Sequence, residues 1–222
     1  DRSGVAVEFL GDPHFDHRLR KAGLYLGAEW SEPRAGTCAI GACIATGEPL
    51  TIHQTDHFDV SHTPLSCTAA PIYDTRGEFA AVLDISLLSS PIAKASQNLA
   101  LHMVAATVRR IELANLMAQT RHEWVLRFSR SPDFLDVDPE AAISLDGSGR
   151  VIGLTHGGAQ ILARAAGVSW RQPELLSRTV GVAMSATSNC PCDNAWIAAP
   201  DPKPRAISTS RPRLRQYPLL RA

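Results

Sequence analysis

The sequence predicts an α/β fold of the α+β kind, in which helices cover an antiparallel sheet and one long C-terminal helix leaves it. Short apolar runs alternate with turn residues as far as position 85. A turn at residues 74–77 joins two of these runs as a hairpin. Between residues 92 and 124 the apolar spacing changes to three or four, without Pro or Gly, which is the period of a helix.

The composition excludes several classes of protein. Lys+Arg and Asp+Glu are equal at 22 each among 222 residues, so we expect no direct contact with nucleic acid. No apolar run is long enough for a membrane span, and no secretion signal is visible. The five cysteines are odd in number and irregularly spaced, which argues against a disulfide framework. We therefore expect a cytoplasmic protein.

The first residues predict a turn at 1–4 and a strand at 5–10. A hairpin turn normally follows a strand, and none precedes this one. We therefore expect the chain to begin inside a domain, with an N-terminal strand and helix missing. A short helix is predicted at 15–22, and a second helix, rich in small residues, at 38–46. Gly47 and Pro49 are typical of the end of that second helix.

Three strands are predicted next, at 50–53, 67–73 and 79–85, in a sheet of about five or six strands. Residues 55–65 are polar and predict a loop with a helical turn. Pro71 indicates a bulge or an edge in the second run. The third run is almost continuously apolar, which predicts a central strand buried on both faces.

The long helix is predicted to cover residues 92–124. Its first half is apolar nearly all round and is expected to lie against the core. Its second half is charged and is expected to project as a connector. Leu113, Leu116 and Met117 are in reach of a partner there, so we expect a homodimer through this helix.

The remainder divides into three segments. Residues 127–139 contain two prolines and predict a linker. A strand at 141–146, a turn at 146–149, a strand at 150–155 and a helix at 158–166 follow. Residues 183–222 carry six prolines without Gly, Glu or His, which indicates a disordered tail or, as we prefer, an aberrant sequence.

Five short blocks carry a family resemblance. They are Trp30–Glu32, residues 36–41, 56–58 and 67–72, and Leu83–Ser86. In this order and spacing they resemble the N-terminal GAF sensor of acetoin-catabolism-type, σ54-dependent transcriptional activators. The resemblance implies a sensor at 1–126 and a partial PAS-like segment at 140–182. It departs from the family at Cys38, usually Asn, and at Leu87, usually Gly.

The resemblance also implies a role. In that family a motor and a DNA reader follow, but this sequence has neither a phosphate loop nor a helix-turn-helix pattern. The chain is therefore expected to be the signal input and not an enzyme. The effectors of the family are small ketones, alcohols and diols, so a small polar organic effector is expected. We expect no cofactor.

The candidate ligand-binding residues are those that supply an apolar wall or a polar group near the expected pocket: Trp30, Ser31, Glu32, Thr37, Cys38, His57, His62 and Cys67. Ser31 and Glu32 are equally suited to starting a helix. His57, His62 and Cys67 can ligate a metal, but their spacing is not that of a structural zinc site, so no metal is expected. Asp84 lies in an apolar run and is interpreted as an anchor for a loop backbone.

Two other functions stay open. One is a GAF-type redox enzyme, such as a free methionine sulfoxide reductase, with Cys67 and a nearby His as the reactive pair. The other is a dimerisation module that binds no ligand. We predict no catalytic residue.

Overall fold

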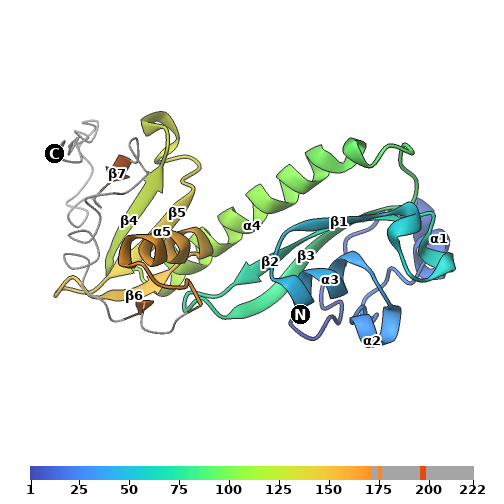
Figure 1. Ribbon diagram of the computed structural model, residues 1–222, viewed down its shortest axis with the longest axis horizontal. Coiled ribbons are helices and arrows are strands. Elements are labelled where there is room, and N and C mark those ends of the chain that lie inside the picture. Colours follow the sequence, from blue (N-terminus) through green and yellow to red (C-terminus); the bar gives the residue numbers. More distant parts are fainter. Residues whose placement is uncertain (172–174, 177–195, 199–222) are drawn as a thin grey trace. The chain divides into compact units, whose positions relative to one another are not determined.

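The structure is a computed structural model that describes residues 1–171, 175–176 and 196–198 (Figure 1). Its contacts divide the chain into two compact units. The first holds Asp1–Ile72 and Phe79–Val108, and the second holds Tyr73–Glu78 and the chain from Arg109 on. The predicted domain boundaries lie elsewhere, at residues 126 and 139, and they stay predictions.

The first unit begins with the predicted turn, in which Gly4 donates its N–H to Asp1 O. The strand predicted at 5–10 is wrong, because only a single bridge forms there, between Val5 and Glu29. Val7 and Leu10 are 64% and 92% exposed, so this run has no buried face to hold it in a sheet. A 3-10 turn, η1 (Pro13–Phe15), leads into helix α1 (Asp16–Lys21), which confirms the helix expected at 15–22.

Two helices follow, the short α2 (Glu32–Ala35) and the predicted small-residue helix, α3 (Ala39–Thr46). Cys38 is the N-cap of α3, and its Sγ accepts the Gly41 N–H at 3.4 Å. Gly47 ends the helix with a φ of 71°, a left-handed conformation that glycine adopts without strain. The prediction for this helix and its end is confirmed.

The sheet of the first unit has three strands in the order β1 (Leu50–His53), β2 (Ser66–Tyr73) and β3 (Phe79–Leu87) (Figure 1). Strand β1 pairs with β2 in antiparallel register, with Leu50 opposite Ala69. Two 3-10 turns, η2 (Gln54–Asp56) and η3 (Val60–His62), form the predicted loop. Helix α3 packs on β1 and β3.

Two predictions about this sheet are wrong. The strand buried along its length is β2, the middle strand, whereas Ile85 and Leu87 of β3 are 37% and 36% exposed. The expected single sheet of five or six strands is instead a three-stranded and a four-stranded sheet in the described part of the chain. An apolar run alone does not show which strand has neighbours on both sides.

The long helix, α4, is continuous but shorter than predicted, covering the 22 residues Asn98–Gln119 after a 3-10 turn, η4 (Lys94–Gln97). Its first half is buried on one face only, since Val104 is fully buried but Leu99 and Met103 are 69% and 54% exposed. Its second half is not a solvent-exposed connector, because the Glu112 and Leu116 side chains are buried, at 4% and 0% exposure. Leu116 is therefore unable to contact a partner, contrary to expectation.

The second unit contains a sheet in the order β6 (Val151–Leu154), β5 (Ala141–Leu145), β4 (Trp124–Ser129) and β7 (Trp196–Ala198). Helix α5 (His156–Ala166) packs on β5 and β6 (Figure 1). The predicted strands at 141–146 and 150–155, their turn and the helix at 158–166 are confirmed. Strand β4 and the 3-10 turn η5 (Pro132–Phe134) lie where a helix end and a linker were expected.

The C-terminal prediction falls mostly outside the described residues. Of the segment 183–222, the structure describes 196–198, which pair with β4 as strand β7. None of the helices in the described ranges combines the length and the apolar composition that a membrane crossing needs.

Candidate functional site

A small cavity lies in the first unit, between the sheet, α3 and the segment before α2. Most of its wall is formed by apolar and thiol side chains, and two polar side chains complete it. The wall residues are Leu24, Trp30, Cys38, Ala39, Ile40, Cys67, Asp84 and Ser86. The centre of a water-sized sphere can move within about 10 Å³ of this cavity, so the cavity has room for about one water molecule. A four-carbon ligand therefore enters only if a wall side chain moves.

The wall around Cys38 is fixed by a close contact between two chain segments. Cys38 Sγ donates a hydrogen bond to Trp30 O at 3.2 Å while accepting from Gly41 N–H. A Cβ on Gly41 would lie 2.9 Å from Glu32 N and 3.2 Å from Trp30 O. Glycine at this position lets α3 approach the Trp30 backbone, and this approach places the indole and the thiol on the same cavity.

Asp84, on β3, is the one carboxylic acid of the cavity wall. Its Oδ2 accepts a hydrogen bond from Ser86 Oγ at 2.7 Å, whereas its buried Oδ1 has no partner in the described part of the chain. Ser86 Oγ also lies 3.1 Å from Cys67 Sγ. Burial raises the pKa of Asp84 to about 7, because the charged form loses its hydration and gains only one hydrogen bond.

The three cysteines in and beside this cavity, Cys38, Cys43 and Cys67, are free and buried. Burial raises the pKa of each thiol, and the carboxylate of Asp84 raises it further. A reactive cysteine needs the opposite environment, one that lowers its pKa and exposes it. These thiols therefore act as apolar wall atoms at neutral pH.

The histidines of the 54–65 loop lie beside Trp30 and do not line the cavity. The His62 ring packs on the Trp30 indole with centroids 4.9 Å apart, and the His57 ring lies 6.3 Å from that of His62. His57 Nδ1 hydrogen bonds with Gln54 O at 3.0 Å, and burial lowers the pKa of His57. Among the described residues, no group of three or more His, Cys, Asp or Glu side chains is arranged to hold a metal ion.

Of the eight candidate residues, the structure brings Trp30, Cys38 and Cys67 to the cavity wall. The other five, Ser31, Glu32, Thr37, His57 and His62, do not line it. Whether any of the eight contacts a ligand stays a prediction. The sequence analysis did not include Asp84 and Ser86 among the pocket residues. The position of the Asp84 carboxyl group within an apolar run could have indicated that it lines a cavity.

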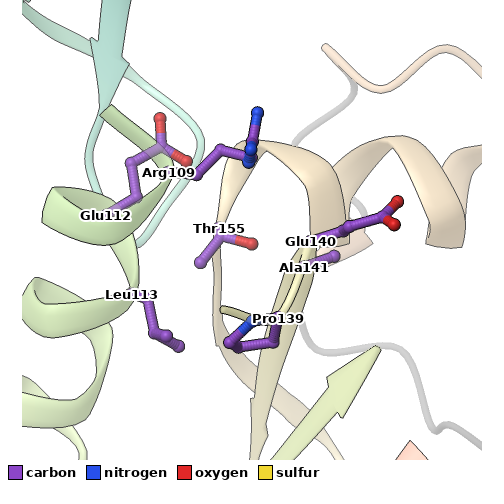
Figure 2. Close-up of a pocket in the computed structure, with 7 residues that line it drawn as sticks. All are labelled: Arg109, Glu112, Leu113, Pro139, Glu140, Ala141 and Thr155. Carbon is purple, nitrogen blue, oxygen red and sulfur yellow. The ribbon is translucent and has the colours of Figure 1, made fainter. Parts of the chain in front are cut away.

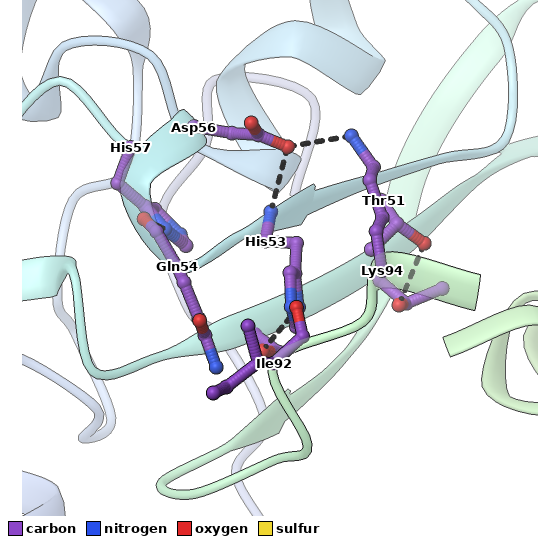
Figure 3. A network of polar contacts seen from close by, with 9 residues as sticks. Thr51, His53, Gln54, Asp56, His57, Ile92 and Lys94 are labelled. Carbon is purple, nitrogen blue, oxygen red and sulfur yellow. Dashed lines mark hydrogen bonds and ion pairs between the residues drawn. The ribbon is translucent and has the colours of Figure 1, made fainter. Parts of the chain in front are cut away.

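A second polar arrangement ties the sheet to the segment before α4 (Figure 3). The buried His53 hydrogen bonds through Nδ1 with Ser66 Oγ at 2.8 Å and through Nε2 with Ile92 O at 3.0 Å. The Nε2 atom is therefore the protonated one, since a carbonyl only accepts. Asp56 pairs with Lys94 and also accepts the His53 backbone N–H. The end of β1 and the turn after it are thus bonded to residues 92–94, which precede the helix.

In the second unit, Glu112 of α4 is buried beside a small cleft lined by Arg109, Leu113, Thr155 and residues 139–141 (Figure 2). Its Oε1 accepts the Tyr73 N–H at 3.0 Å and its Oε2 accepts the His156 N–H at 2.8 Å. Burial raises the pKa of Glu112, although these two hydrogen bonds oppose the rise. One carboxyl group thus holds together the end of β2, α4 and the N-terminus of α5.

The first unit has the fold of a known domain family. The family model of GAF domains matches residues 1–114, more than half of the chain, and the chain belongs to this family. It is related to the acetoin catabolism regulatory proteins, as the five sequence blocks predicted. It is 53% identical over 156 residues to the "Acetoin catabolism regulatory protein" of Cupriavidus necator, a match that covers 70% of this chain and 23% of that protein.

A second relative is the "Acetoin dehydrogenase operon transcriptional activator AcoR" of Bacillus subtilis, 34% identical over 86 residues, or 39% of this chain and 14% of that protein. The chain thus matches less than a quarter of either regulator. Among solved structures, the "Crystal Structure of the E.coli DhaR(N)-DhaL complex" matches with a TM-score of 0.46 and 16% identity, covering 82% of this chain and 59% of that one.

Proposed function

We propose that this chain is the signal-input part of a bacterial σ54-dependent transcriptional regulator, and that its first unit senses a small polar organic effector of the ketone, alcohol or diol class. The observation that carries the proposal is the cavity of the GAF unit, which has one unpaired carboxyl oxygen in an apolar and thiol wall. Ligand sites are typically apolar with a few polar groups that fix orientation. In this proposal the regulator is cytoplasmic, this part makes no contact with nucleic acid, and a partial PAS-like segment begins at residue 140.

The proposed output runs through α4. The His53 and Asp56 contacts bind the loop after β1 to Ile92 and Lys94, two positions shortly before the helix. An effector that favours one packing of that loop would shift the start of the helix, provided that it binds the two packings with different affinity. Lys94→Ala removes the exposed ion pair and should weaken this coupling without removing the effector site.

A thermal-shift screen of the purified chain tests the sensor proposal. The panel contains small ketones, diols and carboxylates at 10 mM. A ligand that binds only the folded state at about 100 times its Kd adds about 2.7 kcal/mol to the free energy of unfolding, which raises Tm. We expect a shift with at least one ketone or diol. No shift across the panel would contradict the proposal and favour a module that binds no ligand.

The enzyme alternative has less support from the thiol geometry, because Cys67 is 5% exposed and burial raises its pKa. NADPH- and thioredoxin-linked turnover of methionine sulfoxide, measured for the chain and for Cys67→Ser, tests it. We expect no cysteine-dependent turnover. Turnover that disappears in Cys67→Ser would overturn the sensor proposal in favour of the reductase.

We also propose a homodimer through α4. Exposed apolar side chains follow a stripe on this helix at Leu99, Met103 and Met117, which are 69%, 54% and 44% exposed. Steps of four and three residues alternate between these positions, passing through Ala106, Arg110 and Leu113. This is the spacing of the contact positions in a two-helix coiled coil.

Sedimentation equilibrium of the full chain and of Met103→Glu tests the dimer. The glutamate should convert the dimer to a monomer, because it places a charge within the stripe. Ala118→Glu is the matched control, since Ala118 is exposed on the same helix but lies about 100° around from Met117. A monomeric parent chain, or equal dimerisation of both variants, would refute this arrangement.

A further inference from the structure

The two carboxyl oxygens of Asp84 are in different situations. Oδ2 is held by the Ser86 hydroxyl at 2.7 Å. Oδ1 is buried on the same cavity wall and has no partner among the residues that the structure describes. A buried polar atom without a partner costs about 1–3 kcal/mol, so a ligand that supplies a partner gains that contact.

Among the residues that the structure describes, no cationic side chain acts on Asp84. The titratable groups that act on it or on its neighbours are the thiols of Cys38 and Cys43 from the α3 side and of Cys67 from β2. All three are uncharged at neutral pH, since burial raises their pKa values. Glu32 and Glu48 act only on the thiols, and both are exposed. His62 packs on the Trp30 indole and does not line the cavity.

We propose that Oδ1 of Asp84 is the polar contact for the effector, and that the site takes a small uncharged molecule whose carbonyl or hydroxyl oxygen lies against it. This inference rests on the sensor function proposed above and adds the recognising atom to it. The protonated carboxyl donates a hydrogen bond to a carbonyl oxygen. The ionised carboxylate instead accepts one from a hydroxyl. A ligand that carries its own carboxylate is rejected in both states, because none of the described residues that line the cavity is a cation. With ionised Asp84 two buried anions would face each other, and with protonated Asp84 the charge of the ligand would still be buried without an ion pair.

The protonation state of Asp84 therefore selects between ligand types. Its pKa of about 7 means that both states are populated near neutral pH. A molecule with only acceptor oxygens needs the protonated state, and its apparent affinity falls with the population of that state. A hydroxyl both donates and accepts, so it fits either state.

Trp30 provides a spectroscopic readout. The cavity holds about one water molecule, so a four-carbon ligand displaces a wall side chain. Trp30 is part of this wall and is 5% exposed, so displacement of its indole would change the environment of the ring. Movement of the indole away from the His62 ring should change the fluorescence of Trp30, and the change should be absent in Trp30→Phe.

The test uses three probes that differ only in their oxygens: butane-2,3-dione accepts only, butane-2,3-diol donates and accepts through hydroxyls, and 3-hydroxybutan-2-one has one oxygen of each kind. Isothermal titration calorimetry measures each Kd at pH 5.5 and 8.5, with lactate as the charged probe. We expect the dione to bind at least about tenfold more weakly at pH 8.5, the diol to change less than about threefold, and lactate not to bind.

Asp84→Asn removes the titration while keeping the shape of the side chain. In this variant the pH dependence of dione binding should disappear, whereas it should persist in the control Asp133→Asn, whose carboxylate is exposed. Ser86→Ala removes the hydrogen bond that lowers the pKa of Asp84, so the pH at which dione binding is lost should rise. This second variant keeps the test valid if Asp84→Asn fails to fold.

The outcomes separate the two proposals. Binding that is equally strong in Asp84→Asn and insensitive to pH would overturn the role of Asp84 and leave the sensor proposal standing. Absence of binding by every probe at both pH values would overturn both.

Discussion

The pH dependence of stability is the most direct measure of the Asp84 environment. The pKa rises from 3.8 to about 7 on folding, so the folded state binds the proton more tightly than the unfolded state does. The stabilisation is present in full below about pH 4 and is lost as the pH rises through 7. A shift of about three units corresponds to about 4 kcal/mol, a large part of the 5–15 kcal/mol typical of a domain.

Asp84→Asn should remove this loss. We expect the variant to be more stable than the parent chain at pH 8.5, by up to about 4 kcal/mol less the weaker Ser86 hydrogen bond. Below about pH 4 the two should be similar, and the difference should grow between pH 4 and 7. Urea denaturation followed by circular dichroism from pH 3.5 to 9 gives the difference curve, in which other titrating groups cancel. Parallel curves for the two proteins would show that Asp84 is ionised without cost, and would refute the reasoning.

Three further predictions concern the second unit, each measured by chemical denaturation of the full chain. Glu112→Ala leaves the N–H groups of Tyr73 and His156 without their charged acceptor and should cost about 2–4 kcal/mol, whereas the exposed Glu123→Ala should change little. Thr155→Ala removes the N-cap of α5 and should cost about 0.5–2 kcal/mol, with recovery in Thr155→Ser; equal loss in both would contradict a capping role. Leu116→Ala empties a fully buried site and should cost about 3–5 kcal/mol, far more than Met117→Ala beside it, and similar losses would refute the assigned burial.

The elements that sequence predicted well are those set by local chemistry. The sequence predicted helix α3 and its end correctly. Gly47 follows the last residue of the helix in the left-handed conformation that is common at helix C-termini. The turn at residues 146–149 was found because Asp146 accepts from the backbone N–H groups of Ser148 and Arg150. Such signals lie within a few residues of one another and do not depend on the rest of the fold.

The elements that were missed depend on distant partners. Strand β4 follows α4 after only a short turn without Gly or Pro, and its pairing with β5 makes it a strand. The candidate site shows the same limit. Trp30, Cys38 and Cys67 were expected at the cavity and line it, whereas His62 contacts the Trp30 indole without lining the cavity. The position of His62 depends on the path of the 54–65 loop, which no local pattern specifies.

The contacts of Tyr73, at the end of β2, have a consequence for preparing the first unit of this chain by itself. The Tyr73 ring stacks on the His156 ring at 4.4 Å, and Trp170 meets both edge-on. A shorter chain ending after α4 would keep the whole GAF match at residues 1–114, but Tyr73 would lose its contacts with the His156 and Trp170 rings and Glu112 would keep only the Tyr73 N–H of its two backbone donors. Removing the neighbour would thus expose an aromatic ring and a poorly satisfied carboxylate, and the isolated sensor would be prone to association through its own hairpin.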